Sequence, residues 1–300
     1  MNAFIKAAEI WVPNHTESDR SSHLHAAASY YGELGHFAEI SATMTFGYGE
    51  GLPGSAWQCG HPVLWSDLRS DRFKRSNFIS DTGIDSGLAI PIFAGDFLQA
   101  VVVLFCGNPG TASGAVEIWQ NDTQSPQQLN LMDGYYGVLE QFAAISRNMT
   151  IQQGESLPGK AWQLDQPLLL QNLANRHCFI RAHPAEECGL ATGLALPYID
   201  NHRNGHVVCL LSTLGTPIAS QYEVWLPDGN QLKFHDGFAI DGSDLHQRYD
   251  GDQIERGEGQ LGKVWLSGVP HLASRNLTAP ILCLPVINAG RLSGIVRLVL

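Results

Sequence analysis

The sequence predicts an α+β protein in which one domain type is repeated three times. The nine residues GEGLPGSAW, Gly49 to Trp57, return as GESLPGKAW at Gly154 to Trp162 and as GEGQLGKVW at Gly257 to Trp265. The three tryptophans are 105 and 103 residues apart (162 − 57 and 265 − 162). A period of that length exceeds the roughly 20 to 50 residues of a solenoid repeat, and it is the size of a small domain.

Other landmarks recur in the same order. Each unit opens on a glutamate two positions before a tryptophan, at Glu9, Glu117 and Glu223. A proline follows each motif tryptophan by five positions, and every unit closes on an apolar run: Pro62, Pro167 and Pro270, with runs Ala100 to Cys106, His206 to Leu211 and Ile295 to Leu300. Duplication explains this order. We therefore predict three units, at residues 1–110, 111–216 and 217–300.

The composition argues against several classes of partner. The 300 residues carry a formal net charge of −11, from 29 acidic and 18 basic residues. Nucleic acids and anionic membranes attract clustered Lys and Arg, so we expect neither as a partner. No apolar run reaches the roughly 20 residues of a membrane helix, and no signal peptide is recognised. The six cysteines mostly lack counterparts between units, which favours reduced thiols in a cytoplasmic protein.

The first half of each unit is expected to contain a hairpin and two helices. Ala115 to Trp119 alternates apolar and polar residues, as a half-buried strand does, and the polar turn that follows predicts a hairpin. Apolar residues at three- and four-residue spacings then predict an amphipathic helix in the second unit: Leu139, Phe142, Ala143, Ile145 and Met149. The Gly-rich motif is expected to end that helix. Pro53 and Pro158 can start a short second helix.

The second half of each unit is expected to be strands. In the first unit these are Val63 to Trp65, Leu88 to Phe93 and Ala100 to Phe105. Strands at both ends with helical crossings between them predict an antiparallel sheet. The joints between units, residues 107–114 and 212–220, leave no room for a linking helix. The three motif tryptophans are expected to be buried at one framework position.

The order of these landmarks resembles that of the GAF domain, a sensory module of bacterial signalling proteins. The first unit carries the resemblance on the following residues: Gly49-Glu50-Gly51-Leu52-Pro53-Gly54, Trp57, Pro62, Asp67-Leu68, Asp71-Arg72-Phe73 and Ala89-Ile90-Pro91-Ile92. The second unit keeps most of them, from Gly154-Glu155 to Ala195-Leu196-Pro197. The resemblance implies three tandem GAF-like units without the flanking terminal helices of that family. One face of each sheet must then be covered by neighbouring units or by a second chain.

The third unit is truncated. From motif tryptophan to strand proline there are 34 residues in the first unit, 35 in the second and 20 in the third (91 − 57, 197 − 162 and 285 − 265). The missing segment corresponds to Arg69 to Ser86, which in GAF-like domains tends to cover the ligand pocket. We expect a cavity between sheet and lid in units one and two, and none in unit three. The expected ligand-binding residues lie in the two lids: Asp71, Phe73, Phe78, His177, Cys178, Phe179, His183 and Cys188.

Motifs for common chemistry are absent or lack their context. GEGLPG and GEGQLG match the dinucleotide fingerprint, but that fingerprint needs a strand entering and a long helix leaving. His177, Cys178, His183 and Cys188 are zinc-ligand types without the spacing of a zinc motif, so no metal site is predicted. No nucleophile elbow, HExxH helix or Walker loop is present. We therefore predict no catalytic residue and no cofactor.

Three functions remain open from the sequence. The first is a non-enzymatic sensory or regulatory protein that binds a small molecule or a partner protein and signals through another chain, with a homodimer expected. The second is a thiol oxidoreductase resembling GAF-type methionine sulfoxide reductases, using Cys178 or Cys188. The third is a structural or dimerisation module with vestigial pockets. A pocket holding a thiol pair would favour the second, and pockets filled by apolar side chains would favour the third.

Overall fold

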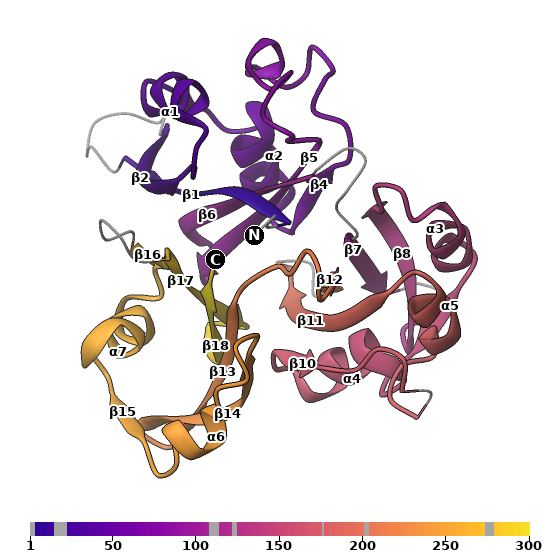
Figure 1. Cartoon of the computed structure of the whole chain (residues 1–300). Coiled ribbons are helices and arrows are strands. Elements are labelled where there is room, and N and C mark those ends of the chain that lie inside the picture. Colours follow the sequence, from indigo (N-terminus) through magenta and orange to yellow (C-terminus); the bar gives the residue numbers. More distant parts are fainter. Residues whose placement is uncertain are drawn as a thin grey trace.

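The computed structural model describes residues 4–14, 23–107, 114–121, 125–175, 177–200, 204–273 and 279–300. Within these residues the chain forms three six-stranded antiparallel sheets, each with helices beside it (Figure 1). The strand order is the same in each: β3-β2-β1-β6-β5-β4, β9-β8-β7-β12-β11-β10 and β15-β14-β13-β18-β17-β16. The predicted α+β class, with three repeated antiparallel units, is confirmed.

The elements follow one plan: a hairpin, a helix, a short strand, the motif helix, a short strand and a final hairpin. In the first unit they are β1 (Ile5–Pro13), β2 (Leu24–Tyr30), α1 (Gly35–Ala42), β3 (Thr45–Phe46), α2 (Gly51–Cys59), β4 (Val63–Trp65), the 3-10 turn Ser76–Phe78, β5 (Ser86–Ala94) and β6 (Phe97–Cys106). In the second they are β7 (Gly114–Asn121), β8 (Gln128–Tyr135), α3 (Glu140–Arg147), β9 (Thr150–Gln152), α4 (Ser156–Leu164), β10 (Leu168–Leu170), α5 (Ala182–Glu187), β11 (Leu190–Ile199) and β12 (Gly205–Thr213). In the third they are β13 (Gln221–Asp228), β14 (Gln231–Ala239), α6 (Leu245–Arg248), β15 (Gln253–Glu255), α7 (Gly259–Ser267), β16 (His271–Ala273), β17 (Ile281–Asn288) and β18 (Arg291–Val299).

The repeated Gly-rich motif is a structural turn that starts the motif helix. A Cβ on Gly54 would lie 2.1 Å from the carbonyl oxygen of Gly47, and the same contact is 2.2 Å at Gly159 and at Gly262. The motif glutamate of the first unit, Glu50, accepts a hydrogen bond from the amide of Gly47. A short strand enters this turn, rather than the helix that was expected, because β3 pairs with β2 after α1 has ended.

The motif tryptophans occupy one framework position, but their burial differs from the expectation. Trp57, Trp162 and Trp265 are each the seventh residue of their helix. Only Trp265 is buried, whereas the other two are half-buried. The fully buried tryptophans lie on the first strand of each unit instead: Trp11, Trp119 and Trp225.

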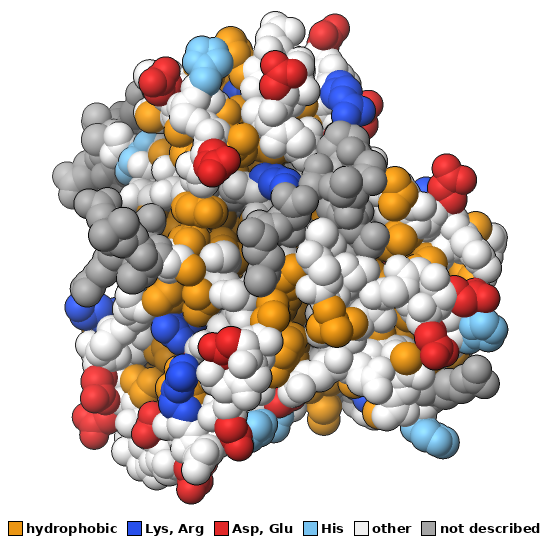
Figure 2. Space-filling view, viewed as in Figure 1, with side chains coloured by type: hydrophobic (Ala, Val, Ile, Leu, Met, Phe, Trp, Pro, Cys, Tyr) orange, Lys and Arg blue, Asp and Glu red, His pale blue; other side chains and the backbone are white. Residues whose placement is uncertain are grey.

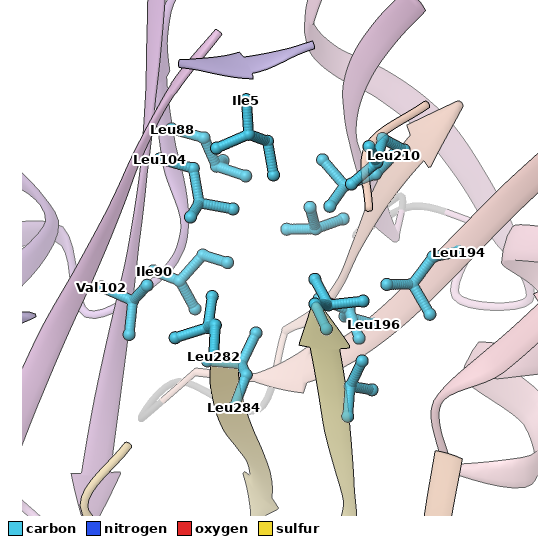
Figure 3. Close-up of a cluster of buried hydrophobic side chains, with 14 of the residues drawn as sticks. Ile5, Leu88, Ile90, Val102, Leu104, Leu194, Leu196, Leu210, Leu282 and Leu284 are labelled. Carbon is cyan, nitrogen blue, oxygen red and sulfur yellow. The ribbon is translucent and has the colours of Figure 1, made fainter. Parts of the chain in front are cut away.

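The three units form a ring and share one central hydrophobic core. In Figure 3, side chains from all three units converge: Ile5, Leu88, Ile90, Val102 and Leu104 from the first, Leu194, Leu196 and Leu210 from the second, and Leu282 and Leu284 from the third. A separate cluster lies between each sheet and its own helices. Neighbouring units therefore cover the sheet face that GAF-like domains without terminal helices would expose.

Contacts between successive units close the ring. β4 lies against β8, joining units one and two, and β16 lies against β2, joining units three and one. Units two and three are joined by the buried Asn288, whose side chain accepts a hydrogen bond from the amide of Ile199 and donates to Asp165 and to the carbonyl of Pro197. The two ends of the chain lie near the centre of the view in Figure 1. Among the described residues, no helix has the length and apolar character needed to cross a bilayer.

Candidate functional site

Each unit holds a buried glutamate beneath the tryptophan of its first strand. Glu9, Glu117 and Glu223 are fully shielded from solvent. Residues two apart on a strand point to the same face, so the indole N–H of each following tryptophan donates to its own glutamate, at 2.7, 2.9 and 2.8 Å. A tyrosine hydroxyl donates to the other carboxylate oxygen: Tyr31 at 2.8 Å, Tyr136 at 3.0 Å and Tyr249 at 3.0 Å. A buried charge of this kind also needs a cation.

In units one and two the cation comes from the lid. Arg75 pairs with Glu9 and Arg181 pairs with Glu117, and both arginines are buried. Each guanidinium also donates to a serine hydroxyl on the first helix of its unit. The serine is Ser41 of α1, at 2.6 Å, in the first unit and Ser146 of α3, at 2.5 Å, in the second. Burial disfavours the charge on Glu117, but the attraction and hydrogen bonds of Arg181 outweigh it, so the pKa of Glu117 is lowered. The pair is therefore charged at neutral pH.

Aromatic rings enclose these two guanidinium groups. Arg75 lies 4.8, 5.1 and 4.9 Å from the ring centroids of Phe37, Phe73 and Phe105. Arg181 lies 4.6 Å from Phe142 and 5.0 Å from Phe179, which correspond to Phe37 and Phe73, and 5.2 Å from Trp119. The place between sheet and lid where a cavity was expected is thus filled by the protein's own side chains. The buried glutamate needs a cation, and the lid supplies it at this place.

The eight predicted ligand-binding residues, which lie in the two lids, differ in burial. Two of them belong to the core of their units: Phe73 and Phe179. Four are exposed: Asp71, Phe78, His177 and His183. The two thiols are half-buried: Cys178 and Cys188. Within the described parts of the chain, no three His, Cys, Asp or Glu side chains gather in an arrangement that could hold a metal ion.

Most of the thiols have environments that disfavour reactivity. Burial and the nearby Glu187 raise the pKa of Cys188. Burial raises the pKa of Cys106 and of Cys283 to about 12, and that of Cys209 well above its usual value. The nucleophilic form of cysteine is the thiolate, which requires a lowered pKa. These four thiols are therefore protonated at neutral pH.

In the third unit, where the lid is missing, the cation comes from the sheet itself. Arg297 lies opposite Glu223 on the neighbouring strand β18 and donates to its carboxylate. The positions opposite the glutamate in the other units are Val103 and Cys209. The arginine side chain is 19% exposed here, against 1% or less for the two lid arginines. The third unit thus keeps the buried carboxylate but leaves its cation partly exposed.

Two cavities lie on the third unit. One, of about 220 Å³, lies beside Arg297 and is lined also by Ile254, Leu261 and residues 258–260. The other, of about 310 Å³, is lined by Phe234, His246, Tyr249 and their neighbours. These cavities contradict the expectation that the third unit has none, and among the described residues no lid side chain covers Arg297.

Two contacting positions, one on the motif helix and one on the sheet, hold different residues in the third unit, where the lid is shorter. In units one and two a buried leucine packs so closely on a glycine of the sheet that a Cβ there would lie 2.6 Å from Leu52 or 2.8 Å from Leu157. The equivalent positions in the third unit hold Gln260 and Ile281. The polar Gln260 therefore takes the place of the buried leucine of the other units. This residue lines the cavity beside Arg297.

Sequence reasoning found the glutamates but missed their arginines. Arg75 and Arg181 lie 66 and 64 residues from their partners, within lid segments of little similarity. Arg297 comes from a different element altogether. One signal was present: Arg297 is a charged residue within the apolar run Ile295 to Leu300, where the corresponding runs of the other units have an uncharged residue.

The fold and site can now be compared with known proteins. No protein-family model matches this sequence, and curated proteins give no match. Solved structures do match, one unit at a time. A hypothetical protein, SA1058, from S. aureus is 12% identical (TM-score 0.29), with 35% of this chain and 82% of that chain covered. The GAF domain of nlh2 from A. aeolicus is 20% identical (TM-score 0.26), with 34% and 58% covered. A free methionine-R-sulfoxide reductase from Neisseria meningitidis is 16% identical (TM-score 0.27), with 35% and 53% covered.

Each of these matches covers about one third of the chain, which is the length of a single unit. The chain itself contains three six-stranded antiparallel sheets with the same strand order. A GAF domain is among the solved structures to which a single unit is similar.

Proposed function

We propose that this protein is a non-enzymatic sensory or regulatory protein whose third GAF-like unit binds a small molecule. The observation that supports this is the open floor of that unit. The Glu223–Arg297 pair lies beside a cavity of about 220 Å³, whereas lid side chains fill the corresponding place in the other units. Binding sites are concave, mostly apolar and furnished with a few placed polar groups.

The open floor offers both kinds of group. Arg297 donates to Glu223 through Nη1, and a guanidinium has five N–H donors in all. Ile254 and Leu261 supply the apolar part, and Gln260 adds an amide. A small molecule with a carboxylate or carbonyl oxygen would accept hydrogen bonds from the arginine while its apolar body contacts the two aliphatic side chains.

Units one and two have a different role in this proposal. Their sites are filled by a charged pair and aromatic rings, the outcome that favours a structural module. We assign them to the framework of the ring, with the signal passing from unit three to another cytoplasmic protein chain. The reductase alternative loses support at one of its two candidate thiols, because burial and Glu187 raise the pKa of Cys188.

Native mass spectrometry of the purified chain, with two tryptophan variants, tests the proposal. Gln260→Trp places a large ring in the open cavity, and Lys263→Trp adds the same ring at an exposed position of the same helix. We expect a bound small molecule on the wild type and on Lys263→Trp, and its loss from Gln260→Trp. If the chain purifies empty, succinate and citrate are titrated by ligand-observed NMR with the same variants. Equal binding to both variants, or no binding of any probe, would contradict the proposal.

A further inference from the structure

We propose a second binding site, on the axis of the ring, that takes a small organic cation such as a protonated amine. A cavity of about 270 Å³ opens where the three units meet. His61, Phe93 and Asp96 of the first unit line it, together with Tyr198 and Asp200 of the second and Ile287 of the third. This site is separate from the open floor of unit three and does not depend on the function proposed for it.

The cavity lies at one end of the central core. Its walls come from the corresponding strands β5, β11 and β17, from the turns that follow them, and from the turn between α2 and β4, which holds His61 and Pro62. These are the strands whose apolar faces meet on the axis. No single unit forms the enclosure, because residues of all three units line it. A ligand bound here would contact all three units at once and would favour the closed ring over a separated one.

A buried hydroxyl at this cavity lacks a partner. The side chain of Tyr198 is 7% exposed, and its hydroxyl has no hydrogen-bond partner among the residues that the structure describes. Burial raises the pKa of this tyrosine, so the group is neutral and can both donate and accept. Buried polar groups are almost always satisfied. A ligand N–H in the cavity would supply the missing partner.

The charge around the cavity is negative. Burial disfavours the charge on Asp200, but hydrogen bonds from Asn204 and His206 outweigh it and lower the pKa of that carboxyl. His206 stacks on His61 with ring centroids 4.6 Å apart. Burial and the proximity of His61 lower the pKa of His206 to about 4, so at neutral pH the imidazole adds no positive charge. The carboxylate of Asp96 lies on the same cavity.

The remaining walls fit the body of an amine. Pro62, Pro91 and Ile287 are apolar, and Phe93 presents an aromatic ring. Aromatic faces attract organic cations. Neither Lys nor Arg occurs among the described residues that line the cavity, so nothing there would attract an anion. The volume lies just below the usual range of about 300 to 1,000 Å³ for ligand pockets, which limits the ligand to about one ring and its amine.

Three probes of one shape and different charge test this site by isothermal titration calorimetry on the full chain. They are benzylamine, benzyl alcohol and benzoate. We expect benzylamine to bind most tightly and benzoate least. Asp96→Asn and Tyr198→Phe should each weaken benzylamine binding by about threefold to tenfold, since each removes one polar contact. The matched controls Asp81→Asn and Tyr48→Phe change exposed residues outside the cavity and should leave the affinity unchanged.

A variant that places a large side chain in the axial cavity tests whether the probe binds there. Ile287→Trp should abolish benzylamine binding, whereas Gln260→Trp, in the open floor of unit three, should not change it. Circular dichroism confirms that both variants fold. Benzoate binding as tight as benzylamine, benzylamine binding that survives Ile287→Trp, or no binding of benzylamine at all would each overturn the axial site. None of these outcomes bears on ligand binding by unit three, so the two proposals fail separately.

Discussion

At the scale of single residues, each unit is organised by one buried carboxylate and the cation that neutralises it. Glu117 and Arg181 are both shielded from solvent, and the carboxylate also accepts from an indole and a phenol. Such a pair adds little net stability when it is intact. Removing one partner leaves the other charge buried in the core without a counter-ion, which is strongly destabilising. The pair therefore fixes which lid conformation is compatible with the folded unit.

Replacing Arg181 by Met should destabilise the protein by about 3 to 5 kcal/mol, because Glu117 would be left buried without its cation. The double variant Glu117→Gln/Arg181→Met should recover most of that loss. The control Arg69→Met removes an arginine that is 64% exposed and pairs with Asp85, and it should cost less than about 1 kcal/mol. Urea unfolding followed by tryptophan fluorescence measures all three. A single variant as stable as the wild type would show that Glu117 takes up a proton instead.

A second residue-scale prediction concerns pH. The pKa of His206 is about 4 in the folded protein, because the imidazole is buried against His61 despite the nearby Asp200, and about 6.5 when unfolded. Between these values the unfolded chain binds more protons, so stability is lost as pH falls from 6.5 towards 4. The shift corresponds to about 3 kcal/mol.

His206→Gln should flatten this part of the stability curve, whereas His177→Gln, at an exposed position, should leave its slope unchanged. Thermal unfolding midpoints measured every half pH unit from 4 to 7 give the slopes. Identical slopes for wild type and His206→Gln would contradict the assignment.

At the scale of elements, the Gly-rich turn and the motif helix form the part that recurs most faithfully. Each motif closes with an amide of its first glycine donating to the carbonyl of the last, as in Gly154 to Gly159 at 2.8 Å. The lids are the variable part: two carry an arginine and one is missing. A conserved turn combined with a variable lid lets one framework hold a filled site in two units and an open site in the third.

Gly159→Ala should cost at least about 2 kcal/mol, because the new methyl group would lie 2.2 Å from the carbonyl oxygen of Gln152 and the turn would have to open. Gly35→Ala, at a position where a Cβ would meet open space, should instead be neutral or stabilising by up to about 1 kcal/mol. Chemical denaturation of both variants checks this. A tolerated Gly159→Ala would mean that the turn is not the constraint behind the repeated motif.

At the scale of the whole molecule, three units close a ring around one shared core. On the face shown in Figure 2, hydrophobic side chains gather towards the centre, where the units meet, and acidic side chains are spread over the outer surface. The sheet faces that form the core are therefore taken up within one chain. The homodimer expected from the sequence stays a proposal, and it would have to use the outer surface.

Leu196→Asp should separate the units, because it places an uncompensated charge among apolar side chains from all three of them. We expect a loss of more than about 3 kcal/mol and a larger radius of gyration in small-angle X-ray scattering. The control Leu266→Asp changes a leucine that is 65% exposed on α7 and should leave both quantities unchanged. An unchanged radius for Leu196→Asp would argue that the ring is held by contacts outside the central core.

The sequence by itself determined the repeat, the α+β class, the order of most elements and the truncation of the third unit, although it missed the short strand that enters each Gly-rich turn. These are local properties: strand alternation, helical spacing and recurring glycines are visible in a short window of residues. The sequence also placed the three glutamates two residues before a tryptophan, which puts both side chains on one face of a strand.

Only the tertiary structure decided how the charges are neutralised and where the cavities lie. The cation for Glu9 comes from the lid and the cation for Glu223 from a strand, and no common spacing connects them. In units one and two, the arginine that neutralises the glutamate is carried by the lid. The axial cavity depends on three units meeting. Ion pairs and cavities depend on residues that are distant in the sequence and close in space. The fold brings such residues together, and the axial cavity forms only when the three units meet.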